Sequence, residues 1–425
     1  MPQSRSARPL SLNRGSTGIA AGTCSRVAAA WAATAVLCLV SSQAADAITR
    51  RAQGDAHPGL AWSATTPDVP LALTGQMAGW APDGKITGEA AEQTRHAIAN
   101  LQVLLRANGS GLNRVVKLNV CVADDIHHAA VVQAIGAAFA NHPVPVSFVR
   151  SRLTNAAALV TLDAVAQVDV DPRAVRVANL STFPAAPCGG HLGFLPAGRR
   201  VFLSGYASRV KDFRAGLREV LESQRKTLAH HGLAPADVAH VKTWLAPLDR
   251  VADIKEALAE FFGPLPVPPM VIVEWSTANG NEIEFVVAGE KADPKRFVGP
   301  LAFGTRPGAE APTRFSHIAF VEAGQPLIFT AGLYGRPGEP ARQQLQDIYA
   351  QLGRILFDAG SGFRHLAKAT YQNADSEAQR ILGEIRDVFY DPARPPAASG
   401  VLVHGVGNPG RIATLDMIAV PISKR

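Results

Sequence analysis

Residues 71–77 read Leu-Ala-Leu-Thr-Gly-Gln-Met, and similar runs return at 201–206 (Val-Phe-Leu-Ser-Gly-Tyr) and 327–334 (Leu-Ile-Phe-Thr-Ala-Gly-Leu-Tyr). Each is a short β-rich run that contains a small hydroxyl residue followed closely by a glycine. The glycines recur roughly every 125–130 residues, and self-similarity at a fixed period indicates tandem repeats. Because 425 residues also exceed the usual size of one core, we predict three copies of one module.

A helical pattern follows each of these runs. Apolar residues recur at i, i+3, i+4 and i+7, which is typical of a helix that covers one face of a sheet. The stripes span residues 94–105, 217–228 and 345–356. Glycines suited to a helix C-cap follow at Gly109, Gly232 and Gly360.

The rest of each copy adds a middle strand, a second helix, a proline-rich entry and two closing strands. This mixture of elements predicts an α+β fold, with modules at 56–170, 175–292 and 300–423. Lys117, Lys242 and Lys368 take similar places in the middle strands. We expect them to point to solvent, because side chains alternate between the two faces of a strand.

The N-terminus has the pattern of a signal peptide, which we assign to residues 1–47. Four arginines precede an apolar run of residues 27–40, and small residues suited to cleavage follow. The run is too short to span a bilayer, so we expect no stable membrane anchor and a periplasmic or secreted protein. The alternative is a misassigned start codon upstream of a cytosolic protein.

The net charge, the cysteines and the histidines indicate which partners, disulfides and metal sites to expect. The formal net charge is +7 and dispersed, which does not favour a nucleic-acid partner. Cys121 and Cys188 lie in different modules, and two unpaired thiols are favoured over a disulfide. The adjacent histidines at 127–128 and 230–231 point apart on one element, so we expect no metal and no other cofactor.

Several short motifs resemble the Rid (YjgF) family of imine and enamine deaminases. They are Leu-Thr-Gly-Gln at 73–76, Leu-Ser-Gly at 203–205, Asn-Glu-Ile-Glu at 281–284 and Arg-Pro-Pro-Ala-Ala-Ser at 394–399. The resemblance extends over nearly all of the chain after the leader. Each motif alone is weak, but their recurrence in register is a stronger signal.

The resemblance implies an assembly. Rid proteins are homotrimers of chorismate-mutase-like modules, with a central β-barrel, outer helices and sites in the clefts between subunits. Three modules in one chain therefore imply a single-chain pseudo-trimer, which we expect to be a monomer in solution. Burial of the second face of each sheet against its neighbours would agree with this arrangement.

The resemblance also implies site residues. The family's deaminases hold the substrate carboxylate with an arginine, and the positions that we match to it are Pro145, Pro268 and Ala398. Arg150 and Arg394 lie nearby as substitute substrate-binding residues, as does Arg152.

The family's catalytic glutamate is matched only by Glu282, with Thr161 and Thr414 in its place in the other modules. The hydroxyl residues and glycines of the first runs are further candidates for substrate binding. They are Thr74, Gly75, Ser204, Gly205, Thr330 and Gly332. A structural alternative is that these glycines only mark bulges where two sheets approach closely.

The leading functional hypothesis is a Rid-like protein that acts on, or binds, small imine, enamine or carbonyl carboxylic acids in its inter-module clefts. Deaminase chemistry is in doubt because the family arginine is absent. The alternatives are a non-catalytic small-molecule-binding or scaffold protein and, with less support, a chorismatase-like hydrolase. Fold analogy cannot choose among them.

Overall fold

The computed structural model describes residues 47–422, except 56, 278–279, 293, 295–298 and 311–313. Apart from residue 47, the predicted signal peptide lies outside the described residues. Within the described part of the chain, no helix combines the length and apolar character needed to cross a bilayer.

The same order of elements occurs three times: three strands, a helix, a middle strand, a second helix and two closing strands. We call residues 49–167, 176–288 and 301–419 the first, second and third repeats. The first contains β1 (Thr49–Ala52), β2 (Leu60–Thr66), β3 (Leu71–Thr74), a short β4 (Met77–Ala78), α2 (Ala90–Arg106), β5 (Val115–Val122), α3 (His128–Ala138), β6 (Val144–Arg150) and β7 (Val160–Gln167).

The second and third repeats follow the same order without an equivalent of β4. The second contains β8 (Arg176–Ala178), β9 (Leu192–Leu195), β10 (Arg200–Ala207), α4 (Phe213–His230), β11 (Val238–Ala246), α5 (Val251–Phe262), β12 (Met270–Glu274) and β13 (Gly280–Ala288). The third contains β14 (Leu301–Gly304), β15 (Ile318–Val321), β16 (Leu327–Thr330), α6 (Ala341–Asp358), β17 (Leu366–Asn373), α7 (Ser376–Phe389), β18 (Ala397–Leu402) and β19 (Ala413–Ala419).

The first helices form as predicted. The buried residues of α2, α4 and α6 recur every three or four positions, which is the stripe that a sheet can cover. Gly109, Gly232 and Gly360 follow these helices with φ of 75°, 75° and 72°, a conformation that glycine adopts without strain.

The strands pair in the same order in each repeat: β6-β5-β7-β3, β12-β11-β13-β10 and β18-β17-β19-β16. Three antiparallel pairs connect the repeats, namely β3 with β9, β10 with β15, and β16 with β2. Each repeat therefore pairs with both others. The strands group into one 13-stranded and one six-stranded sheet, and the α+β prediction is confirmed.

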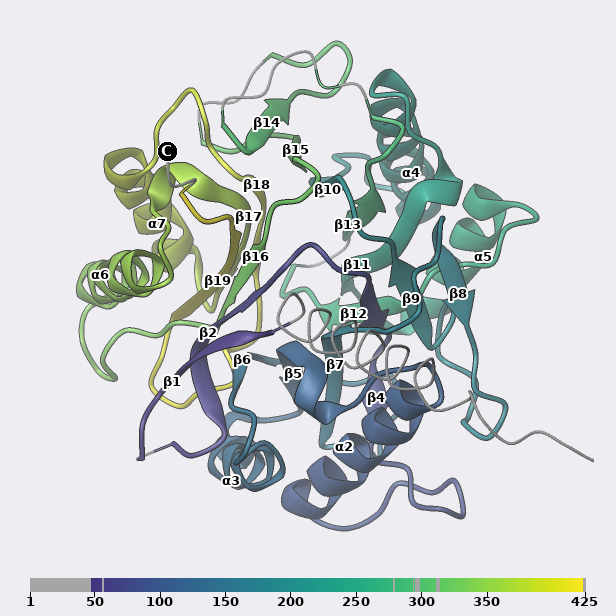
Figure 1. The fold of residues 1–425 in the computed structure, drawn as a ribbon, viewed down its shortest axis with the longest axis vertical. Helices are drawn as coiled ribbons and strands as arrows, with labels where there is room; N and C mark the ends of the chain where they lie inside the picture. Colours follow the sequence, from purple (N-terminus) through teal and green to yellow (C-terminus); the bar gives the residue numbers. More distant parts are fainter. Residues whose placement is uncertain are drawn as a thin grey trace, which may run out of the picture. The chain divides into compact units, whose positions relative to one another are not determined.

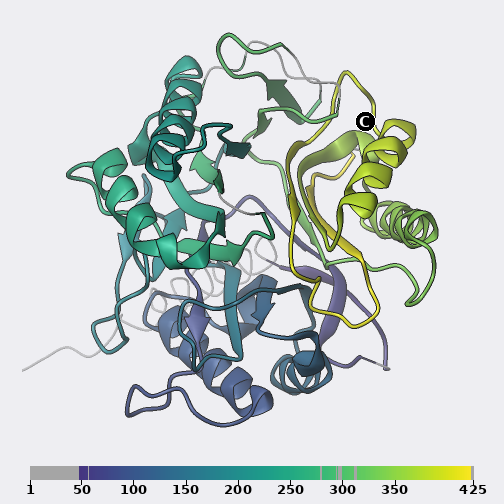
Figure 2. The same ribbon diagram turned by 180° about the vertical axis from the view of Figure 1, so that it is seen from behind.

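Figures 1 and 2 show the three helix pairs α2/α3, α4/α5 and α6/α7 at the periphery of the described part, with the strands inside. Each repeat has its own apolar core between helices and sheet. Two further apolar clusters combine residues of all three repeats on the other faces of the sheets. These sheets are therefore covered on both faces.

The middle strands correct two expectations about the lysines. Lys117 and Lys368 are only 4% and 5% exposed, so the prediction that they point to solvent is wrong. A register shift precedes Lys117, His240 and Lys368 in their pairing with β7, β13 and β19. The residue equivalent to the two buried lysines is therefore His240, and Lys242 lies two residues further along the strand.

Candidate functional site

A buried polar network joins the first and third repeats. Lys117 Nζ donates hydrogen bonds to Ser147 Oγ and to the carbonyl of Thr330, both at 2.6 Å. Ser147 Oγ donates to Asp416 Oδ2 at 2.8 Å, which lies 3.7 Å from Lys117 Nζ. Burial lowers the pKa of Lys117 to about 8, against the opposing effect of Asp416.

An equivalent network joins the second and third repeats. Lys368 Nζ donates to Glu284 Oε2 at 2.6 Å and to Ser399 Oγ at 3.2 Å, and Ser399 Oγ donates to Glu284. Both ionic side chains are about nine-tenths buried or more. In each of these junctions a lysine, a serine and a carboxylate thus meet between two repeats.

The junction between the first and second repeats has a different composition. His240 Nε2 donates to the carbonyl of Thr74 at 3.2 Å, and burial lowers the pKa of His240 to about 4, so the ring is neutral. Asp163 accepts from Asn119 Nδ2 at 2.7 Å. Burial raises the pKa of Asp163 to about 6, and the charge of Lys242 opposes this shift.

These groups surround a cavity of about 90 Å³ in the interior shared by the three repeats. Lys117, Lys242 and Lys368 line it together with Asp163, Glu284 and Asp416. Cations and carboxylates are equal in number around the cavity, so it does not offer a site of one charge sign.

The predicted hydroxyl residues lie at the junctions, and backbone groups occupy their oxygens. Thr74 Oγ1 accepts from Ala164 N at 2.9 Å, and Thr330 Oγ1 accepts from Met417 N at 2.8 Å. Ser204 Oγ accepts from Ala398 N of the third repeat at 2.7 Å. Each hydroxyl therefore satisfies a buried backbone N–H of a neighbouring strand.

The predicted glycines lie where two repeats approach each other. A Cβ at Gly75 would lie 3.3 Å from the carbonyl oxygen of Gly190, and one at Gly332 would lie 3.0 Å from Ser147 Cα. At Gly205 a Cβ would lie 1.9 Å from Glu282 Oε1. The absence of a side chain thus allows close packing at all three positions.

Glu282 lies against Gly205 at the junction of the second and third repeats. Its side chain is buried, and burial followed by the charge of Glu284 raises the pKa of Glu282 to about 8. The carboxyl group is therefore mostly protonated at neutral pH. Thr161 and Thr414 take the equivalent positions, since these residues pair with the same point of each middle strand.

Strand register refines the positions matched to the family arginine. Val146, Met270 and Ala398 pair with equivalent residues of β5, β11 and β17. The counterparts of Pro145 are therefore Pro269 and Ala397, one residue away from the positions predicted in the second and third repeats. None of these residues is an arginine, so the arginine is absent in either register.

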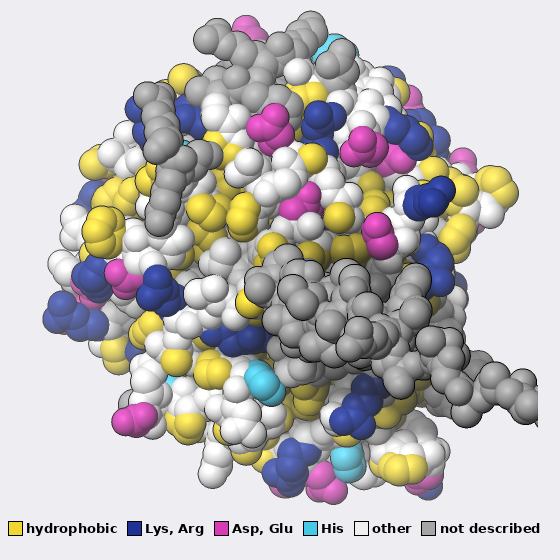
Figure 3. All heavy atoms as spheres, viewed as in Figure 1, with side chains coloured by type: hydrophobic (Ala, Val, Ile, Leu, Met, Phe, Trp, Pro, Cys, Tyr) yellow, Lys and Arg dark blue, Asp and Glu magenta, His cyan; other side chains and the backbone are white. Residues whose placement is uncertain are grey.

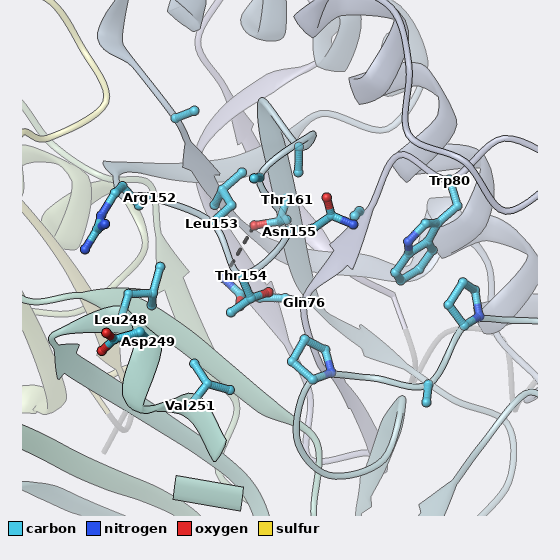
Figure 4. A pocket seen from close by; sticks show the side chains of 17 residues that line it. Gln76, Trp80, Arg152, Leu153, Thr154, Asn155, Thr161, Leu248, Asp249 and Val251 are labelled. Carbon is cyan, nitrogen blue, oxygen red and sulfur yellow. Dashed lines mark hydrogen bonds between the residues drawn. The ribbon is translucent and has the colours of Figure 1, made fainter. Parts of the chain in front are cut away.

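A cavity of about 800 Å³ lies between the first and second repeats; we call it the first cleft. Gln76 lies on its floor, where its side chain bonds the backbone of Ile272 through Nε2 at 2.9 Å and Oε1 at 3.1 Å. Gln76 Nε2 also donates to Thr161 Oγ1 at 3.4 Å, the dashed line in Figure 4.

Arg152, which follows β6, is the arginine that lines the first cleft (Figure 4). Its Nε lies 2.6 Å and its Nη2 2.5 Å from Oε1 of Glu274, the last residue of β12. The Glu274 side chain is 6% exposed and the Arg152 side chain 68% exposed. A buried carboxylate of the second repeat thus holds an accessible guanidinium of the first.

The two arginines predicted for substrate binding lie elsewhere. Arg150 is 3.7 Å from Asp125 Oδ2, donates to the carbonyl of His404, and lines an adjoining cavity of about 300 Å³, which Arg152 and Glu274 also line. Arg394 lies in the turn between α7 and β18 and does not line the first cleft. Comparison of the three repeats gives no signal that would select Arg152, because the loops that follow the equivalent strands differ between repeats.

Comparison with known proteins gives one family match. Residues 62–168 match the model of the family "Endoribonuclease L-PSP". No curated protein matches the chain. The matched segment corresponds to most of the first repeat, from β2 to the end of β7.

Similar solved structures include NMB1025 from Neisseria meningitidis, a member of the YjgF family, at 25% identity and a TM-score of 0.23; it covers 29% of this chain and 97% of its own. Rv2704 from Mycobacterium tuberculosis, of the YjgF/YER057c/UK114 family, has 25% identity and a TM-score of 0.21, covering 29% and 100%. Yeast YEO7 has 23% identity and a TM-score of 0.23, covering 29% and 99%. The family match thus identifies the first repeat, residues 62–168, as a domain of this family.

Proposed function

We propose that the three repeats are three Rid modules, at 56–170, 175–292 and 300–423, which together form the family's trimeric arrangement within one chain. Identical strand orders, the cyclic pairing of the repeats and the two apolar clusters shared by all three support a central barrel with outer helices. The chain then needs no partner copy. Light scattering of the mature protein should give one chain per particle, and a stable particle of three chains would contradict the arrangement.

We further propose that the protein binds small carboxylic acids in the first cleft and does not deaminate imines. The observation that carries this proposal is the separation of two groups. The accessible arginine, Arg152, lies in the first cleft, where Thr161 takes the acid position. The acid, Glu282, lies at the next junction, where Ala397 takes the arginine position.

Deamination by the family's chemistry needs both groups at one substrate, an anchor for its carboxylate and an acid beside the attacking water. In the first cleft Thr161 stands in place of the family's glutamate, and at the second junction Glu282 has no arginine at the family position. The raised pKa of Glu282 and the close packing of its carboxyl group on Gly205 favour a structural role for it.

Arg152 keeps hydrogen-bonding capacity for a ligand. A guanidinium has five N–H donors, and Nε and Nη2 are directed at a single oxygen of Glu274. The remaining donors are accessible from the cleft, and the buried partner restricts the rotamers of the side chain. A cavity of about 800 Å³ also falls within the usual range for small-molecule sites, which favours a binding protein over a scaffold alone.

The name of the family model refers to an endoribonuclease, but we do not propose RNA as the ligand. On the face in Figure 3, lysine and arginine side chains are interspersed with aspartate and glutamate. A continuous basic patch is the usual mark of a surface that binds nucleic-acid backbones.

We also propose that residues 1–47 direct export, which replacement of Leu37 and Leu39 by arginine should block.

Calorimetric titration with 2-oxobutanoate tests the binding site. Arg152→Ala should weaken binding about tenfold or more, because a hydrogen bond to a charged group contributes roughly 1.5–3 kcal/mol. Arg214→Ala is a matched control, since Arg214 is also exposed and paired with a carboxylate, Asp253. Equal affinity of the two variants would exclude Arg152 as the carboxylate anchor of the first cleft.

A further inference from the structure

The end of the first cleft that contains Arg152 carries a second, oppositely charged group. Figure 4 shows Asp249 on the same side of the cavity as Arg152, whereas Trp80 lies at the opposite end. Asp249 comes from η4 (Leu248–Arg250), the turn between β11 and α5 of the second repeat. Its carboxylate is exposed and has no hydrogen bond or ion pair within the described residues.

The charges at this end suit a ligand with both a negative and a positive group better than a simple anion. Arg152 is already paired with the buried Glu274, and Asp249 adds a second carboxylate. A ligand that carries only a carboxylate would gain the hydrogen bonds of Arg152 but meet an excess of negative charge. A ligand that carries a cation next to its carboxylate would match both groups.

Apolar side chains surround this charged pair. Leu153 follows Arg152 in the first repeat, and Leu248 and Val251 flank Asp249 in the second. Figure 4 shows the three side chains near Arg152 and Asp249. Leu248 is 8% exposed and belongs to the core of the second repeat, so it gives a fixed apolar wall.

From this arrangement we infer that the first cleft binds apolar α-amino acids as zwitterions. The carboxylate lies on Arg152, the protonated amino group on Asp249, and a branched side chain among Leu153, Leu248 and Val251. Because the two charged residues come from different repeats, the ligand bridges the first and second repeats. This inference rests on the proposed carboxylate site and specifies its ligand class.

The test compares three probes by calorimetric titration: L-leucine, 4-methyl-2-oxopentanoate, which lacks the amino group, and 2-oxobutanoate. The wild type should bind L-leucine more tightly than 4-methyl-2-oxopentanoate. Asp249→Asn should weaken L-leucine binding roughly threefold to fivefold, the range of an exposed ion pair, and should leave or improve binding of both oxo acids. Arg152→Ala should weaken all three.

Trp80→Ala is the control within the same cavity, because Trp80 lies at the far end. It should leave L-leucine affinity unchanged, and a loss as large as that of Arg152→Ala would contradict the compact ligand. Equal binding of L-leucine and its oxo analogue, with no effect of Asp249→Asn, would overturn the inference but leave the carboxylate site standing. Absence of binding by all three probes would overturn both.

Discussion

The junction between the first and second repeats differs from the other two. Each of the other two junctions places a lysine and a serine of one repeat against a carboxylate of another. Lys117 and Ser147 lie against Asp416, and Lys368 and Ser399 lie against Glu284. At the first junction the equivalent positions hold neutral His240 and Val271, and the carboxylate is Asp163. The large cleft lies at this exceptional junction.

The difference shows how a buried charge can be balanced in two ways. Lys242 lies two residues beyond His240 on the same strand, so it points to the same face and still opposes the raised pKa of Asp163. Its Nζ is 5.0 Å from the ring centroid of Trp244. The first junction therefore keeps charge balance without the short ion pair that links the others.

The largest expected effect comes from breaking a short ion pair. Lys368→Met leaves Glu284 buried without its cation, and such a loss destabilises a protein by roughly 3–5 kcal/mol. Urea unfolding monitored by tryptophan fluorescence measures the change in unfolding free energy. Lys85→Met is the control, because Lys85 is 74% exposed and should contribute little. A loss under 1 kcal/mol for Lys368→Met would mean that this junction is not held by its charges.

The second prediction concerns the separation of Arg152 from Glu282. Ammonia release from 2-iminopropionate, generated in situ, should be at least about 100-fold slower than for a Rid protein that has the arginine, since ~1.4 kcal/mol corresponds to tenfold in rate. All three equivalent positions lack an arginine, so no cleft compensates for another. Turnover within tenfold of that control would show that another arginine anchors the substrate. Alanine variants of Arg150, Arg152 and Arg394 would then identify it.

The same comparison shows what the sequence could predict. The helices, the middle strands and the closing strands follow from hydrophobic periodicity and from glycine C-caps, and the structure contains them. The sequence does not predict the short strands that open each repeat, such as β1 and β8. They are three or four residues long, and their pairing with β2 and β9 gives no periodic signal of its own.

The register of the second repeat could not be read from spacing. Lys242 falls near the period of the other lysines, but strand pairing places His240 at the equivalent position, after the same bulge that precedes Lys117 and Lys368. The segments that separate the equivalent positions 117, 240 and 368 differ in length, so spacing along the chain does not identify them. Likewise the sequence favoured Arg150, whereas Arg152 reaches the cleft, because only the contact with Glu274 of another repeat selects between them.

A third prediction uses the raised pKa of Glu282, about 8 in the folded protein against 4.5 for an unperturbed glutamate. Between these values the folded protein binds more protons than the unfolded chain, so stability falls as the pH rises from about 4.5 to about 8. Glu282→Gln removes this dependence and should gain on the wild type by up to about 1.4 kcal/mol per pH unit in this window. Urea unfolding at several pH values measures it. Glu260→Gln, on the exposed face of α5, should show no such trend.

The smallest effect is expected at the exceptional junction itself. Lys242 is half-buried and makes no salt bridge within the described residues, so Lys242→Met should lower the unfolding free energy by about 1 kcal/mol or less, far below the loss for Lys368→Met.

A second measurement distinguishes an electrostatic role of Lys242 from a purely structural one. Because the charge of Lys242 holds down the pKa of Asp163, the variant should raise that pKa above about 6. The fall in stability on ionisation of Asp163, which begins near its unfolded pKa of 3.8, should then extend to higher pH. Carboxyl-carbon NMR of Asp163 reports the shift directly. If Lys242→Met destabilised the protein as much as Lys368→Met, the three junctions would be energetically alike, and the contrast between a short ion pair and a displaced charge would fail.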